Sequence, residues 1–311
     1  MAGIPDSLKG RSYTRVSDWS RDELELALDL ADELKQERLR RKELRVLPGR
    51  TIGMIFHKPS TRTRVGFEVG IAELGGMALY LPAADLQLAR GESYRDTALV
   101  LSRFVSALLI RTFDQAEVDT FAEYASIPVI NGLTDLAHPL QALADAMTIR
   151  ERLGGLEGVR ITYLGDGNNV CHSLMRLAAR FGMHFTAACP AGYEPSATVT
   201  TAARADATAS GGSVRLTTDP LEGSDAADVL YTECGQAWVR RTSASSGSST
   251  SSASASTANF YRSRAVRRWL CTACRRTSGR RLPRTCCTGR DLSCGIRRRT
   301  ACIPRRRSWR S

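Results

Sequence analysis

The sequence predicts two α/β domains, each built on a doubly wound parallel sheet, followed by a tail that belongs to neither. Strand-like apolar runs alternate with helix-like segments in both halves of the body, which is typical of parallel sheets wrapped by helices. The chain has 311 residues, more than one ordinary hydrophobic core holds. After residue 233 the composition changes abruptly. We therefore expect domains at 1–150 and 151–233, the second one partial, and a tail at 234–311.

Apolar spacing predicts the elements of the first domain. Residues 22–34 form an amphipathic pattern that Asp18 or Ser20 is placed to cap. Gly75-Gly76 is expected to end a helix, and 85–93 to be an irregular polar loop. The other expected elements are a strand at 51–56, a helix at 65–74, a strand at 77–81, a helix from 94 to about 104, a strand at 105–110, a strand ending at 130, and a helix to about 153.

The second domain is expected to begin after Gly154-Gly155, which resembles a hinge. A strand at 159–164, a Gly-rich turn at 165–169 and a helix at 170–181 come first, and strands at 184–189 and 228–232 follow. This order resembles the first unit of a nucleotide-binding sheet. The turn lacks the full G-x-G-x-x-G spacing, so it is weak support for a dinucleotide site.

The segment Phe56-His-Lys-Pro-Ser-Thr-Arg-Thr-Arg64 joins a strand to the start of a helix. First-turn amides have no partner inside a helix, so such a junction offers backbone N–H groups to an anion. Hydroxyls and guanidinium groups beside them suit a phosphate or another oxyanion. A capped helix start with scattered basic residues explains the same residues equally well.

Two further segments place polar residues at strand ends. Arg111 closes the strand at 105–110, where parallel sheets bind ligands, although a surface arginine is an equal alternative. His138 precedes Pro139 at a helix start, with Gln141 one turn on. A lone histidine is more often structural than catalytic, but its place beside a third strand end favours a role in the site.

Composition excludes some classes of protein. No apolar run approaches the roughly 20 residues of a membrane span, and the first residues lack a basic and then apolar signal, so we expect a cytoplasmic protein. The net charge of +12 is unevenly distributed. Residues 234–311 carry 19 Arg and one acid, Asp291, whereas 1–233 carry 25 Lys and Arg against 31 Asp and Glu.

Four motifs in order resemble the aspartate/ornithine carbamoyltransferase family over about residues 7–233. They are Phe56-x-Lys-Pro-Ser-Thr-Arg-Thr-Arg64, Asp85-Leu-Gln-x-x-Arg-Gly-Glu-Ser93, His138-Pro-x-Gln-Ala-Leu-Ala-Asp145 and Gly165-Asp-Gly-Asn-Asn169. The second and fourth motifs resemble the ornithine branch. The resemblance implies carbamoyl transfer from carbamoyl phosphate to the δ-amine of L-ornithine, in arginine metabolism. It also implies a homotrimer, with no metal, no cofactor, no membrane and no specific nucleic acid.

The same resemblance implies roles for individual residues. Carbamoyl phosphate would contact Ser60, Thr61, Arg62, Thr63, Gln87, Arg111, His138 and Gln141, and ornithine would contact Asn169. Arg62, Arg111 and His138 would be the catalytic residues among them. Cations and amides that grip the phosphate hold it more strongly as negative charge develops on it, and a donor from His138 would stabilise the oxyanion at the carbamoyl carbon.

The tail does not continue the resemblance. The ornithine branch should read Asp-Val-Trp-x-Ser-Met-Gly near residue 233, with His-Cys-Leu-Pro and Glu-Asn-Arg further on. Shifting the reading phase by one base lets Glu233–Val239 encode Val-Trp-Ala-Ser-Met-Gly, Leu270–Arg275 encode Met-His-Cys-Leu-Pro, and Cys294–Ala301 encode Trp-Asp-Gln-Ala-Glu-Asn-Arg. Our hypothesis is that 234–311 is an out-of-frame translation caused by one lost base in an Asp codon, through a sequencing error or a real lesion. Resequencing across codon 233 tests it, because an unchanged read rules out the error.

Other interpretations of the tail carry less weight. Cys271-x-x-Cys274 with Cys286, Cys287, Cys294 and Cys302 suggests zinc, and the arginines suggest nucleic acid. The tail has no His, its second Cys pair lacks the usual spacing, and it has few aromatic residues for base stacking. High like charge and little apolar surface predict disorder. The alternatives kept open are a carbamoyltransferase for another amine acceptor, or a nucleic-acid-binding protein with a basic tail.

Overall fold

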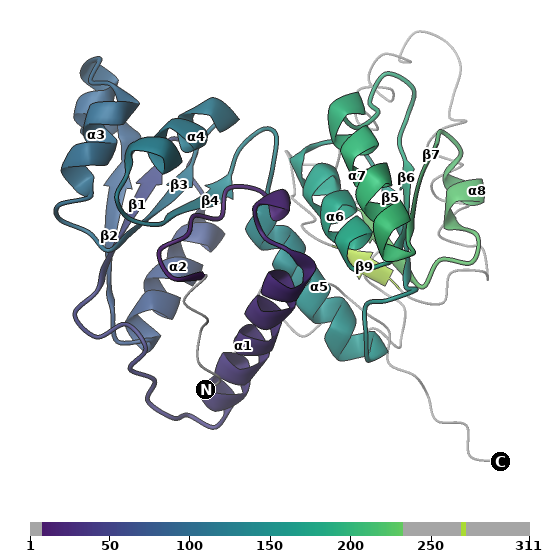
Figure 1. Ribbon diagram of the computed structural model, residues 1–311, viewed down its shortest axis with the longest axis horizontal. Coiled ribbons are helices and arrows are strands. Elements are labelled where there is room, and N and C mark those ends of the chain that lie inside the picture. The colour runs from purple at the N-terminus through teal and green to yellow at the C-terminus, as the bar shows by residue number, and fades with distance from the viewer. Residues whose placement is uncertain (1–7, 233–268, 272–311) are drawn as a thin grey trace, which may run out of the picture. The chain divides into compact units, whose positions relative to one another are not determined.

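The computed structural model describes residues 8–232 and 269–271 (Figure 1). Contacts between Cα atoms divide the chain into two compact units. Unit 1 holds the described residues up to Leu143 together with Asn168–Leu174, and unit 2 holds Ala144–Gly167 and the described residues from Met175 onward. The two parallel-sheet α/β domains expected from the sequence are confirmed, and each unit is described by itself below.

Unit 1 contains a four-stranded parallel sheet in the order β2-β1-β3-β4. Its strands are β1 (Thr51–Phe56), β2 (Met77–Pro82), β3 (Ala107–Arg111) and β4 (Val129–Leu133). The chain lays β2 on one side of β1 and then crosses to place β3 on the other side. The winding therefore reverses between β1 and β3, and ligands of such sheets bind outside the carboxyl ends of the strands at this switch point.

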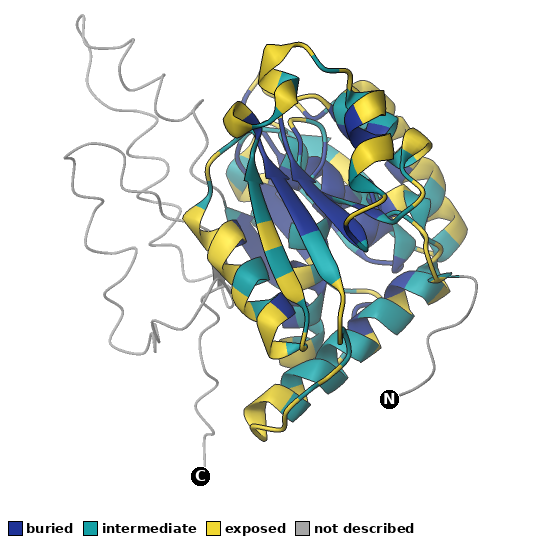
Figure 2. Cartoon of the chain, turned by 90° about the vertical axis from the view of Figure 1, so that its left-hand side faces the viewer, coloured by how far each residue is buried: buried dark blue, intermediate teal, exposed yellow. Residues whose placement is uncertain are grey.

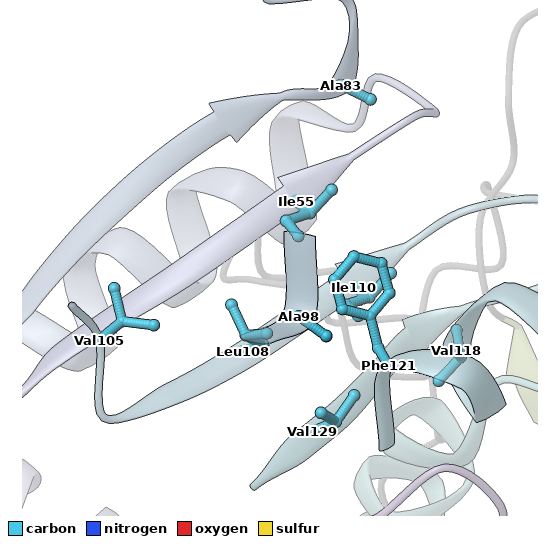
Figure 3. Close-up of a cluster of buried hydrophobic side chains, with 9 residues drawn as sticks. All are labelled: Ile55, Ala83, Ala98, Val105, Leu108, Ile110, Val118, Phe121 and Val129. Atoms are coloured by element: carbon cyan, nitrogen blue, oxygen red, sulfur yellow. The ribbon is translucent and has the colours of Figure 1, made fainter. Parts of the chain in front are cut away.

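The strands of this sheet point apolar side chains to both of its faces, and helices cover both faces for that reason. Ile55, Leu108 and Ile110 pack against side chains of α3 (Tyr94–Leu101) and α4 (Gln115–Tyr124), as Figure 3 shows for this core cluster. Met54, Phe56 and Leu109 point the other way and pack with α2 (Thr61–Glu73). The remaining elements assigned to the first half of the chain are η2 (Val16–Asp18), α1 (Arg21–Leu39), η3 (Ala83–Asp85), η4 (Gln87–Arg90) and α5 (Pro139–Leu153).

Unit 2 contains a parallel sheet in the order β7-β6-β5-β8-β9. The strands are β5 (Arg160–Leu164), β6 (His184–Ala188), β7 (Ser213–Thr217), β8 (Val229–Thr232) and β9 (Trp269–Cys271). Its helices are α6 (Asn169–Arg180), which begins in unit 1, α7 (Ala197–Ser210) and α8 (Pro220–Ser224). The winding reverses between β5 and β8, so the turn after β5 lies at the switch point of this sheet.

Several expected boundaries were wrong, each for a local reason. Helix α2 begins at Thr61, four residues earlier than expected, because Ser60 caps it. Helix α1 is capped by Ser20, which was one of the two candidates. Strand β4 includes Asn131 and Gly132, which the sequence suggested were a loop. No helix or strand was expected from the sequence at α4, α7, β7 or α8.

The disordered tail expected from the sequence lies outside the described residues, apart from β9. That short segment pairs in parallel with β8, Tyr231 lying opposite Leu270. Within the described part of the chain, no helix combines the length and apolar character needed to cross a bilayer.

Candidate active site

The first part of the candidate site is the junction between β1 and α2. Ser60 is the N-cap of α2; its Oγ accepts a hydrogen bond from the Thr63 amide at 3.4 Å and lies 3.0 Å from Thr63 Oγ1. Thr61, Arg62 and Thr63 thus occupy the first helical turn, where backbone N–H groups are available to an anion. Thr61 and Arg62 are exposed, whereas Thr63 is buried.

The two arginines of this motif are placed differently. Arg64 pairs with Glu68 of the same helix at 2.9 Å, and its guanidinium carbon lies 3.7 Å from the centre of the Tyr80 ring. Arg62 lies in the first turn and is exposed, and within the described residues it forms no ion pair and no contact with an aromatic ring. The Arg64 guanidinium therefore already has two partners, whereas the contact of Arg62 with phosphate stays a prediction.

Arg111 lies beside this junction. It is the last residue of β3, pairs in register with Phe56 at the end of β1, and is only 8% exposed. The His57 amide donates to the Arg111 carbonyl at 2.9 Å, which ties the loop after β1 to the end of β3. A buried cationic residue thus lies at the switch point, and its backbone is bonded to the loop that leads from β1 to α2.

The loop after β4, residues 134–138, carries His138 to the same edge of the sheet. The Thr112 amide donates to the Leu133 carbonyl at 2.9 Å and the Asp135 amide to Phe113 at 2.8 Å, so the loops after β3 and β4 run together. Inside the loop, the Ala137 amide donates to Thr134 Oγ1 at 3.0 Å. His138 immediately precedes α5 and is half-buried, as is Gln141 in the first turn.

A lysine missed by the sequence analysis links the first and third loops. Lys58 forms an ion pair with Asp135, and its ammonium lies 4.1 Å from the centre of the Phe113 ring. Lys58 belongs to the anion motif itself, and Asp135 stands three residues before His138. The motif therefore contained the signal, but the partner of Lys58 was 77 positions away in the chain.

Asn169, expected at the ornithine side, also meets the His138 loop. It is the first residue of α6, and its side-chain amide donates to the Thr134 carbonyl. This contact lies within unit 1, because Asn168–Leu174 groups with that unit. His172 and Ser173, one turn further along α6, contact the same loop and were also missed by the sequence analysis.

Gln87 is placed apart from these residues. It is exposed in η4, which follows the edge strand β2, and β2 lies on the opposite side of β1 from Arg111. The remaining expected residues are gathered at the junctions after β1, β3 and β4 and at the start of α6. The result is a candidate site that groups a buried arginine, the loop that carries His138 and the Asn169 side-chain amide.

The whole described body matches a known family. A family model described as "Aspartate/ornithine carbamoyltransferase, carbamoyl-P binding domain" matches residues 11–151, and one described as "Aspartate/ornithine carbamoyltransferase, Asp/Orn binding domain" matches residues 157–247.

Individual relatives agree with the family models. The ornithine carbamoyltransferase of Anoxybacillus flavithermus is 51% identical over 226 residues, which is 73% of this chain and 72% of that protein. The solved ornithine carbamoyltransferase of Pyrococcus furiosus is 50% identical with a TM-score of 0.71 and covers 72% of each chain. The anabolic ornithine carbamoyltransferase of Campylobacter jejuni has a TM-score of 0.71 at 31% identity, covering 86% of this chain and 87% of that one.

Proposed function

We propose that this chain, which belongs to the aspartate/ornithine carbamoyltransferase family, derives from an enzyme that carbamoylates the δ-amine of L-ornithine, giving L-citrulline and phosphate. It is a carbamoyltransferase, and relatives that are 51% identical over 226 and 227 of its residues are named ornithine carbamoyltransferases. The observation that carries the proposal is the meeting of the α2 N-terminus, Arg111 and the His138 loop at one switch point. A cytoplasmic location and a role in arginine biosynthesis complete the proposal.

In this proposal the first turn of α2 holds the phosphate of carbamoyl phosphate. The Thr61 amide and the hydroxyls of Ser60, Thr61 and Thr63 donate to phosphate oxygens, and Arg62 and Arg111 supply positive charge. These groups bind more strongly as the bridging oxygen takes up charge, so they stabilise the transition state more than the substrate. Arg111 contributes most per contact because it is buried, where the effective dielectric is low.

The carbamoyl group would lie at the start of α5. His138 donates to the carbamoyl carbonyl oxygen, and Gln141 orients the carbamoyl amide. The neutral δ-amine of ornithine attacks the carbamoyl carbon with its lone pair, and the C–O bond to phosphate breaks. Phosphate leaves with that electron pair, and the surplus proton of the amine passes to phosphate or water. Asn169 contacts the amino-acid end of ornithine, and Gln87 contacts carbamoyl phosphate from its exposed turn.

The written C-terminal segment leads us to expect that the 311-residue chain is inactive. Strand β8 ends at Thr232, and the residues that follow lack the Asp-Val-Trp-x-Ser-Met-Gly expected of the ornithine branch, although the match to the family model runs to residue 247. The test compares the 311-residue chain with a frame-restored chain, using carbamoyl phosphate and ornithine and measuring citrulline. The proposal is supported if the frame-restored chain forms citrulline and the 311-residue chain does not. Citrulline formed by the 311-residue chain would contradict its expected inactivity.

The two alternatives are tested with the same proteins. A panel of amine acceptors on the frame-restored chain distinguishes ornithine from another acceptor. DNA binding by the 311-residue chain that disappears on deleting 234–311 would show only a charged tail, whereas sequence preference would be needed for a nucleic-acid-binding function. The comparisons give neither alternative support.

We also propose a homotrimer, with active sites near subunit contacts. The edge strand β2 exposes apolar side chains, Met77 at 58% and Leu79 at 40%, and Figure 2 colours the chain by burial. An open, apolar strand edge is costly unless another surface covers it. Analytical ultracentrifugation of Leu79→Lys should show a smaller species than the parent, whereas Leu39→Lys, at the exposed end of α1, should not change the mass. Equal masses for all three would argue against β2 as the contact.

A further inference from the structure

The first turn of α6 contacts the loop that carries His138 at three points. Asn169, His172 and Ser173 are spaced i, i+3 and i+4, which places them on one face of the helix. Asn169 donates to the Thr134 carbonyl, His172 contacts the Leu136 carbonyl, and Ser173 accepts from the His138 amide. All of these residues belong to unit 1. One helical face therefore binds successive backbone groups of the 134–138 loop.

The His172 contact fixes the state of its ring. Nδ1 lies 2.9 Å from the Leu136 carbonyl oxygen, which can only accept, so Nδ1 carries the proton. Only 9% of the residue is exposed, and burial lowers the pKa of this imidazole below its ordinary value. His172 is thus a neutral donor that holds the middle of the loop.

The Ser173 contact acts on His138 itself. Ser173 Oγ accepts the backbone N–H of His138 at 2.8 Å, and Ser173 is buried. The His138 carbonyl accepts from the amides of Gln141 at 3.1 Å and Ala142 at 3.3 Å. Pro139 further restricts the backbone of the residue before it. Both ends of His138 are therefore held, which fixes the point from which its side chain extends.

We propose that His172 and Ser173 are positioning residues, which hold the 134–138 loop so that the His138 imidazole stays directed at the carbamoyl group. The proposal rests on the function proposed above, because His138 acts there on the carbamoyl oxygen. Site geometry has to be kept within about 0.5 Å to be productive, and a displacement of about 1 Å can cost roughly a hundredfold in rate. Neither residue needs to touch substrate to have this effect.

The test uses the full 311-residue chain and carbamoyl phosphate itself as the probe. His172→Leu removes the donor, whereas His172→Asn can place its amide nitrogen where Nδ1 was and restore the bond. Ser173→Ala removes the acceptor of the His138 amide. The matched control is Ser102→Ala, because Ser102 Oγ likewise accepts a backbone amide, that of Ser126 at 3.1 Å, but lies outside the loop. The readouts are the Kd by titration calorimetry, the ring 15N resonances of the four histidines, and stability in urea.

Ser173→Ala and His172→Leu should each weaken carbamoyl phosphate binding about tenfold and shift the ring resonances of His138. His172→Asn and Ser102→Ala should bind within about twofold of the parent, with the His138 resonances unchanged. Unchanged affinity and unchanged resonances in both disruptive variants would overturn the proposal. A parent that does not bind carbamoyl phosphate would contradict the proposed function, and the His138 resonances alone would then decide the positioning role. If His172→Leu does not fold, the comparison of Ser173→Ala with Ser102→Ala tests the positioning role in the same way.

Discussion

Replacing Ser60 with aspartate separates the two roles that this residue has in the proposed site. Ser60 caps α2 and is also a proposed phosphate ligand. Aspartate is as good an N-cap as serine, and its charge is favourable at a helix N-terminus by about 0.3–1 kcal/mol. We therefore expect the free energy of unfolding of Ser60→Asp to stay within about 0.5 kcal/mol of the parent or to rise slightly.

Binding of carbamoyl phosphate should respond in the opposite way. A carboxylate about 4 Å from a phosphate charge is repelled by about 4 kcal/mol at an effective dielectric of 20. That energy corresponds to roughly a thousandfold in Kd. Arg62 and Arg111 offset part of the repulsion, so we expect a loss of at least about a hundredfold, measured by titration calorimetry.

Ser60→Ala is the matched control. The cap bond is long, 3.4 Å from the Thr63 amide to Ser60 Oγ, so its loss should cost at the low end of capping energies, about 0.5–1 kcal/mol in urea unfolding. Loss of one hydrogen bond to a charged ligand is worth about 1.5–3 kcal/mol, which is roughly 10- to 150-fold in Kd. Alanine should thus be the less stable variant and aspartate the weaker binder. An aspartate variant that binds carbamoyl phosphate as tightly as the parent would refute the placement of phosphate at α2.

Three other predictions concern stability. Lys58→Met should lower the free energy of urea unfolding by less than about 1 kcal/mol, because the ion pair with Asp135 is partly exposed and the ring contact is weak; a loss above 2 kcal/mol would contradict this. Gly167→Ala should lower the free energy of unfolding by about 3 kcal/mol, since an added Cβ would lie 2.1 Å from the Pro195 nitrogen. Gly155→Ala is the control: nothing lies within 4 Å of its added carbon, so its stability should be nearly unchanged, with both variants measured by thermal melts. The third follows from the lowered pKa of His172: the unfolded ring binds a proton below about pH 6.5 while the buried ring stays neutral. Stability should therefore fall as the pH drops below about 6.5, more steeply in the parent than in His172→Asn, and parallel curves would argue against it.

The strands of the first sheet could be predicted because their environment is uniform. Strand β1 is Thr51–Phe56, the run expected from its apolar residues alone, and its last four residues are buried. The first residues of helices were harder to predict, because they depend on the capping residue. With Ser60 as its cap, α2 begins at Thr61, four residues before the apolar spacing, so the last four residues of the anion motif lie within the helix.

Strand β4 shows what a local pattern cannot supply. The side-chain Nδ2 of Asn131 donates to the Thr14 carbonyl at 2.9 Å and to Gln115 Oε1 at 3.2 Å. An asparagine followed by glycine usually marks a turn, but here partners from distant segments satisfy the side chain inside a buried strand. Close approach explains the glycine, because a Cβ on Gly132 would meet the Ile110 carbonyl oxygen at 3.2 Å.

The site was predictable to the extent that chemistry was concentrated in motifs. Ser60, Arg111 and His138 could be named from strand ends and helix starts, and the resemblance assigned their roles. The supporting residues could not, since Lys58 meets Asp135 and Ser173 meets His138 only through the fold. Asn169, His172 and Ser173 have the spacing of one helical face, but spacing alone does not indicate what that face contacts.

The end of β8 has a practical consequence for rebuilding the protein. Leu230 and Tyr231 are buried, and the Tyr231 ring stacks on Tyr163 with centroids 5.5 Å apart, so the strand is fully seated in its sheet before Thr232. A gene fusion that joins residues 1–232 to the C-terminal third of a relative would place its seam at the end of a strand that is already packed in its sheet. The donor part would bring its own acceptor loop and its own strand beside β8, and the carbamoyl phosphate half would be inherited without redesign.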